Sequence, residues 1–154
     1  MGKLSNQSAA NGWTDELIVD FNDFSVANAG TLADNATYIV SYSVPAGTHL
    51  RNISANLTTA FDDSGSGDEL NVSAGLTGGD VDGYLASAAI HVDMTEITTV
   101  VNTGALLDNE NAVHFASADT IDFLFTPNAS TGTNYSLNEL NAGSISFKFD
   151  IAQI

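Results

Sequence analysis

The chain has 154 residues, no cysteine, and 19 acidic side chains against 3 basic ones, which gives a formal net charge of −16. This length suits one domain, the lack of cysteine excludes disulfides and thiol chemistry, and the scarcity of Lys and Arg argues against direct binding to nucleic acid. No segment approaches the roughly 20 apolar residues that cross a bilayer, and no apolar stretch follows Lys3, so neither a membrane span nor a signal peptide is expected.

The first elements in chain order are an arm and a β domain. Residues 1–13 are small and polar until Trp13, so we expect an extended N-terminal arm over 1–13 and a sandwich domain over 14–154. Lys3 brings one of the three basic groups into this arm, and Trp13 is a rigid aromatic of the kind that anchors protein interfaces. Lys3 and Trp13 are therefore the expected interface residues.

The rest of the chain alternates apolar and polar residues with period two, which is typical of half-buried strands. The expected strands are DELIVDFNDF, ATYIVSYSVPAG, HLRNISANLTTAF, ELNVSAGL, SAAIHVDM, NAVHFAS, TIDFLFTP and GSISFKFDIAQI. In the third of these, one face holds Ile53, Ala55, Leu57, Thr59 and Phe61. Helix signals are weak and reduce to one turn in DGYLASAA. About eight short strands, each with one polar face, predict an all-β, single-domain, jelly-roll-like β-sandwich.

Two acidic loops are candidate ion sites. DDSGSGD offers Asp62, Asp63 and Asp68, and TGGDVDGY offers Asp80 and Asp82. Carboxylates suit Ca²⁺, but neither EF-hand spacing nor Gly-Asp nonapeptide repeats occur. Because Asp, Ser and Gly are also common turn formers, the pattern favours simple turns, with a hairpin from Asp62 to Asp68. We therefore expect no cofactor and keep calcium as the alternative.

Catalytic motifs are missing from the sequence. The histidines His49, His91 and His114 have no metal-motif spacing. Ser117 and Asp119 lie near His114 in sequence, but no nucleophile-elbow motif surrounds the serine. The chain is therefore not expected to be an enzyme.

The acidity is of a particular kind, because Asp supplies 14 of the 19 acidic residues and lysine occurs only at Lys3 and Lys148. A compact body with this charge repels itself in ordinary salt, and the repulsion largely disappears at about 1 M salt, where the Debye length is about 3 Å. This composition resembles that of proteins from halophilic archaea.

Three segments carry a resemblance to a known family. They are VPAGTHLRNISANLTTAFDDSGSGDELNVSAG, GGDVDGYLASAA and SADTIDFLFTPNASTGTNYSLNELNAGSISFKFDIAQI, and the likeness extends over residues 44–154. They resemble small all-β virion proteins of tailed viruses, namely capsid decoration or cement proteins, which are often trimeric. The resemblance implies a homotrimer that binds the major capsid protein of a tailed, haloarchaeal virus. Its place would be the virion surface, after assembly in the host cytoplasm.

Two other functions stay open from the residues. A receptor- or glycan-binding module of a tail or spike could use loops at one end of a sandwich, with Asp80, Asp82 and Tyr84 as candidates. A calcium-dependent surface module of a cell is a further alternative.

Overall fold

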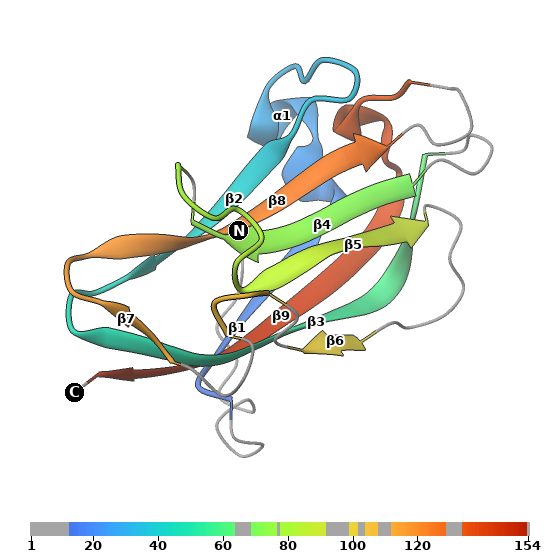
Figure 1. Ribbon diagram of the computed structural model, residues 1–154. Coiled ribbons are helices and arrows are strands. Elements are labelled where there is room, and N and C mark those ends of the chain that lie inside the picture. The colour runs from blue at the N-terminus through green and yellow to red at the C-terminus, as the bar shows by residue number, and fades with distance from the viewer. Residues whose placement is uncertain are drawn as a thin grey trace.

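The computed structural model of the protein describes residues 13–63, 69–76, 78–91, 99–101, 104–107, 112–128 and 134–153. Lys3, Asp68 and nearly all of the expected arm lie outside the described residues. The elements are β1 (Asp15–Asp20), η2 (Phe21–Phe24), α1 (Val26–Ala29), β2 (Tyr38–Val44), β3 (Thr48–Asp62), β4 (Glu69–Gly75), β5 (Leu85–His91), β6 (Thr99–Val101), β7 (Val113–Phe115), β8 (Asp119–Asn128), η4 (Leu137–Glu139) and β9 (Ala142–Gln153). Figure 1 shows the strands as two layers that face each other.

The two sheets have the strand order of a jelly roll. One sheet has the order β1-β9-β3-β6, with β7 also paired to β3, and the other has the order β2-β8-β4-β5. All pairs are antiparallel. When β7 is set aside, the pairs β1·β9, β2·β8, β3·β6 and β4·β5 are nested, first strand with last, second with next to last, and so on. This nesting is that of one long hairpin rolled into a sandwich, and the expected all-β sandwich is confirmed.

The core lies between the sheets and follows from the period-two pattern. Fully buried side chains include Ile53, Leu57 and Phe61 from β3, and Phe123 and Phe147 from β8 and β9. Phe123 and Phe147 have ring centroids 4.3 Å apart across the two sheets. The inward faces expected for ELNVSAGL, TIDFLFTP and GSISFKFDIAQI are confirmed through β4, β8 and most of β9.

Two local expectations were wrong, and one strand was missed. Thr59 is exposed, because the pairing of β3 with β9 shifts register on both sides of it. DGYLASAA forms no helical turn: Asp82 and Gly83 lie in a turn, and Leu85 begins β5. The three-residue β6 was not expected at all, since a strand this short has too few residues to show a period.

The strands on either side of Asp62 to Asp68 do not pair as the expected hairpin. β3 belongs to one sheet and β4 to the other. Asp62 pairs instead with Ala142, and its carbonyl oxygen accepts a hydrogen bond from the Asn141 N–H at 2.7 Å. Turn-forming residues between two alternating segments are compatible both with a hairpin and with strands that belong to different sheets. Which of the two forms depends on pairing with strands that are distant in sequence. By contrast, β4 and β5 do pair as a hairpin.

One end of the sandwich is held closed by Asn138, which follows Ser136 and Leu137 at η4. Its Nδ2 donates to the carbonyl oxygens of Phe24 at 2.5 Å and Gly30 at 3.0 Å, and its Oδ1 accepts from the Leu32 N–H at 2.7 Å. These bonds tie the connection between β1 and β2 to the connection between β8 and β9. In the described ranges, no helix has the length and apolar character needed to span a membrane.

Candidate functional site

The outer side of the sheet that contains β1, β9 and β3 is the most distinctive surface, and we call it the polar face. Its members alternate with the core residues of the same strands, and most are small or charged. They are Glu16, Ile18, Arg51, Asn52, Ser54, Asn56, Thr58, Ser144, Ser146, Lys148 and Asp150. Three of them, Ser54, Ser146 and Asp150, are themselves buried. The face ends at Asp20, the last residue of β1, whose side chain caps η2 by accepting a hydrogen bond from the Asn22 N–H at 2.8 Å.

The polar face is close to neutral in a strongly acidic chain. It holds Arg51 and Lys148, two of the three basic residues in the sequence, and three acidic residues, Glu16, Asp150 and, at its end, Asp20. The face therefore has a formal net charge of only −1, whereas the whole chain has −16. Because repulsion between two acidic bodies is weaker where local charge is nearly balanced, this face is suited to contact another acidic surface.

Contacts within the polar face fix its charged groups. Arg51 Nη2 lies 2.9 Å from Asp150 Oδ1, with the Arg51 side chain 53% exposed and that of Asp150 10% exposed. Ser146 donates from Oγ to Glu16 Oε1 at 2.5 Å. These contacts hold the carboxylates of Glu16 and Asp150 in place on the sheet.

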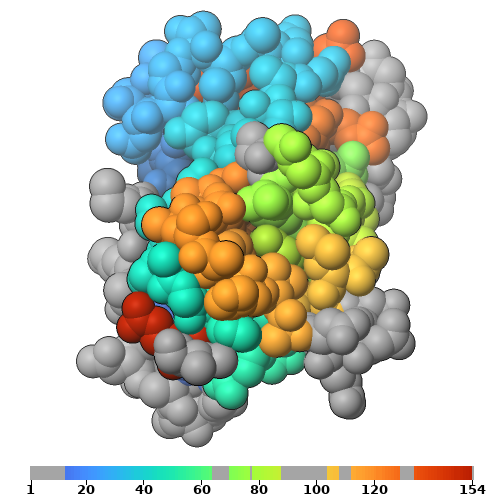
Figure 2. Space-filling view, turned by 60° about the vertical axis from the view of Figure 1, so that its left-hand side comes forward, coloured from blue at the N-terminus to red at the C-terminus, as the bar shows by residue number. Residues whose placement is uncertain are grey.

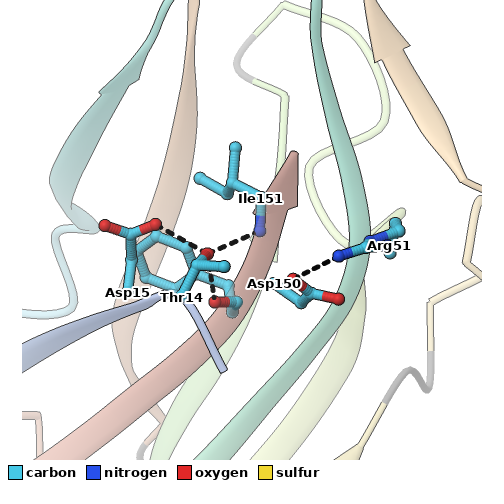
Figure 3. Close-up of polar contacts among 6 residues, drawn as sticks. Thr14, Asp15, Arg51, Asp150 and Ile151 are labelled. Atoms are coloured by element: carbon cyan, nitrogen blue, oxygen red, sulfur yellow. Dashed lines mark hydrogen bonds and ion pairs between the residues drawn. The ribbon is translucent and has the colours of Figure 1, made fainter. Parts of the chain in front are cut away.

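A polar network begins where β1 meets β9, on the inner side of the same strands. The Thr14 hydroxyl lies 2.8 Å from Asp15 Oδ2 and 3.2 Å from the Phe149 carbonyl oxygen, and it accepts a hydrogen bond from the Ile151 N–H at 2.7 Å. The Tyr42 hydroxyl donates to Asp15 Oδ1 at 3.1 Å. Figure 3 shows Thr14 between Asp15 and the backbone of Ile151.

The environment of two tyrosines keeps them protonated. Burial, followed by the charge of Asp15 and the hydrogen bond to it, raises the pKa of Tyr42 to about 12. Burial, followed by the charges of Asp119, Asp122 and Asp80, raises the pKa of Tyr84 to about 12. Both phenols therefore remain hydrogen-bond donors at any physiological pH.

We expect the protein to lose stability in alkali because of these two phenols. In the unfolded chain Tyr42 and Tyr84 ionise near pH 10, whereas in the folded chain they keep their protons to about pH 12. The free energy of unfolding should therefore be insensitive to these groups below about pH 10 and fall between about pH 10 and 12. Urea titrations across this range measure it. The variant Tyr84→Phe should show a shallower fall, and an equally steep fall in that variant would contradict the assignment.

The acidic loops do not gather into an ion site in the part of the chain that the structure describes. Asp62 and Asp63 lie at the end of β3, and Asp80 and Asp82 are exposed between β4 and β5. Within the described ranges, no three His, Asp or Glu side chains lie close enough together to hold a metal ion.

Tyr84 is a core residue, which removes one candidate for ligand contact. It is 1% exposed, and its ring packs edge-on against Phe115 with centroids 6.3 Å apart. The loop before it folds back on β4, where the Tyr84 N–H donates to the Ala74 carbonyl oxygen at 2.9 Å. Figure 2 shows this loop, in yellow-green, beside the orange segment that contains β7. Tyr84 therefore cannot offer its ring to a sugar, as the glycan-binding alternative required.

Trp13, expected at an interface, is partly buried and lies just before β1. The next residue starts the pairing with β9, because the Thr14 N–H donates to the Phe149 carbonyl oxygen at 3.1 Å. The polar face was not foreseen from the sequence. In the sequence, the basic residues of this face occur in two strands whose outward positions are rich in Ser and Asn. That these positions form one face follows only from the pairing of β3 with β9.

The excess of acidic groups leads to a salt prediction. Raising NaCl from about 0.1 M to about 1 M shortens the Debye length from about 10 Å to about 3 Å, so self-repulsion of the folded chain should fade and stability should rise. A gain of about 2 kcal/mol would raise the midpoint of thermal unfolding by about 4–8 °C. The control is a neutral osmolyte at matched concentration, which does not screen charge. A midpoint that is flat or falls with NaCl would contradict a halophilic origin.

Comparison of the chain with protein-family models, with curated proteins and with solved structures finds no match.

Proposed function

We propose that the protein is a structural virion protein that decorates the capsid of a tailed virus and reinforces its shell. The observation that carries the proposal is the polar face, a nearly charge-balanced sheet surface on a chain of net charge −16. A coat protein must lie against a shell over a broad area without a catalytic cleft, and a sandwich with one nearly neutral face suits that task. A jelly roll alone does not specify function, since one fold serves many.

In this proposal the partners are the major capsid protein and further copies of the same chain, as a homotrimer at a three-fold position of the shell. Linking three copies raises the effective concentration of the second and third contacts, so that small faces can bind tightly together. The arm with Lys3 and Trp13 would contact a neighbouring subunit or the shell. No cofactor is required, and the site of action is the capsid surface.

The first test is the copy number of the chain in purified particles, measured by quantitative mass spectrometry against the major capsid protein. A decoration protein should be present in hundreds of copies. A few copies per particle would contradict the proposal and favour the receptor- or glycan-binding tail module.

The second test addresses the polar face. Particles stripped of the protein are incubated with wild type, with Lys148→Gln, and with Val26→Glu. The last variant makes the same charge change at α1, where Val26 is 59% exposed and lies outside the strands that form the polar face. Lys148→Gln should bind about tenfold more weakly, equivalent to about 1.4 kcal/mol, and Val26→Glu should bind like wild type. Equal weakening by both variants would mean that net charge, and not this face, controls binding.

The third test removes residues 1–13. If the shortened protein folds and binds particles as tightly as the full chain, the proposed role of the arm is wrong.

A further inference from the structure

The core of the sandwich opens into a pocket at the edge where β1 and β2 lie, and we call it the edge pocket. Its volume is about 220 Å³. Its walls include Asp15 from β1, Tyr42 from β2, Thr48 from β3 and Ile151 from β9, with Pro45 and Gln153 at the same site. Four strands from both sheets thus contribute to one hollow.

Three polar residues of this pocket stand at positions where the strand pattern calls for apolar ones. Asp15 is in phase with the buried Leu17, and Thr48 is in phase with the buried Leu50. Tyr42 faces the core as well, since its ring lies 4.7 Å from that of Phe149. A polar side chain at a core position lowers the stability of the fold unless it has hydrogen-bond partners. The presence of three such side chains around one pocket therefore indicates a functional role.

Thr48 supplies the observation that points to a ligand. Its side chain is 0% exposed, and its Oγ1 has no hydrogen-bond partner among the described residues. Buried hydroxyls in native proteins are nearly always paired with protein or with a bound molecule. Thr48 is one of the residues that line the edge pocket, so a group held there would give its hydroxyl a partner.

Asp15 supplies the charge. Within the described residues, its carboxylate receives hydrogen bonds from Thr14 and Tyr42 and takes part in no ion pair. A carboxylate has about four acceptor positions, so two hydrogen bonds leave room for more. A partly enclosed carboxylate with neutral partners favours a cation, and the net charge of −16 attracts cations to the molecule.

We infer that the edge pocket binds a primary ammonium group on an aliphatic stem. The ammonium has three N–H donors and no acceptor. It would donate to Asp15, to the Thr48 hydroxyl oxygen and to the Tyr42 oxygen, whose own proton is directed to Asp15. The stem would pack along Ile151 and Pro45, and the Tyr42 ring adds attraction for the charge. The source is either a lysine side chain of a partner protein or a free polyamine. This inference does not depend on the proposed function.

The test is a titration of the full-length protein with butylammonium chloride, followed by amide NMR shifts at about 0.15 M NaCl, where long-range attraction is screened. Saturable shifts are expected at Thr48 and Ile151, with a dissociation constant on the order of 1 mM. Butanol, which has the same stem without the charge, should give no saturable shift. Saturation by butanol, or no saturation by any probe, would overturn the inference and leave water as the partner of Thr48.

Variants separate the pocket from the general field of the protein. Asp15→Asn should weaken butylammonium binding about tenfold, whereas Asp34→Asn, an equal charge change at an exposed turn, should leave it unchanged. Equal effects of the two variants would overturn the site. Thr48→Val, which keeps the shape, should weaken binding about fivefold while the midpoint of thermal unfolding stays equal or rises, because the unpaired hydroxyl is gone. Unchanged binding by Thr48→Val would also overturn it.

Titrations with other ligands identify the source of the ammonium group and test alternative ligands of the edge pocket. Nα-acetyl-lysine methylamide binding at least as tightly as butylammonium would assign a partner lysine, and tighter binding of spermidine would assign a polyamine. If KCl produces the same saturable shifts, the pocket is an alkali-ion site. If glucose saturates and butylammonium does not, it is a polyol site. Either of these last two results overturns the ammonium assignment.

Discussion

Replacing Phe123 by alanine is expected to lower the free energy of unfolding by about 3–5 kcal/mol. The Phe123 ring is fully buried, and it lies 4.3 Å from the ring of Phe147 and 6.1 Å from that of Phe149, centroid to centroid. It thus joins the central strand β8 of one sheet to the central strand β9 of the other. Its removal leaves a cavity at the middle of the sandwich that the two sheets cannot close without breaking their pairing.

Chemical denaturation monitored by circular dichroism measures this loss, and the midpoint of thermal unfolding should fall by roughly 10 °C. Phe123→Leu, which keeps most of the volume, should cost much less. Ile39→Ala, on the outer side of β2 where Ile39 is 39% exposed, should change the free energy of unfolding by no more than about 0.5 kcal/mol. A loss below about 1 kcal/mol for Phe123→Ala would mean that the packing between β8 and β9 is wrong.

Gly143→Ala is expected to cost about 3–5 kcal/mol, because two penalties coincide at this position. Gly143 has a φ of +126°, a conformation that L-residues rarely adopt. A Cβ there would also lie 2.1 Å from Phe61 Cδ1 and 2.6 Å from Phe61 Cα. Phe61 is fully buried, so it has no space into which to withdraw.

Gly30 provides the matched control for Gly143. It also has a positive φ, +74°, but a Cβ at Gly30 would meet no atom within 4 Å. Gly30→Ala should therefore show only the backbone penalty, about 1–3 kcal/mol, since a ψ of −174° places Gly30 in a region that is nearly exclusive to glycine. Urea titrations of the two variants give the difference directly. Similar losses for both would show that the contact with Phe61 does not exist as described.

The pattern of the sequence predicted what is local in this fold. Alternation located the strands and selected inward residues such as Leu70, Phe123 and Ile145, because side chains of a strand point to opposite faces in turn. The pattern could not assign strands to sheets. Asp62 and Asp63 look the same whether β4 turns back on β3 or crosses to the other layer, and the expected hairpin there was wrong.

The candidate sites depend on distant pairings for the same reason. Lys148 and Arg51 are about a hundred positions apart in the sequence, and they lie on the same face of the sheet only because β9 pairs with β3. Asp15, Tyr42 and Thr48 reach the edge pocket from three strands and two sheets. One signal of the pocket is present in the sequence itself, namely that Asp15 and Thr48 break the alternation at inward positions.

The nested strand order also determines when this chain can fold. β9 is the last strand in the sequence, yet it lies between β1 and β3 and pairs with both. During synthesis at 5–20 residues per second, β1 therefore waits for β9 for roughly 6–25 s, and the edge of β3 that pairs with β9 waits for roughly 4–18 s. Nascent chains with open, apolar edges aggregate readily, and many copies made at once would increase that risk. The nascent chains are already acidic, and the repulsion between them opposes this aggregation. The same negative charge that destabilises the folded protein therefore keeps incompletely synthesised copies apart.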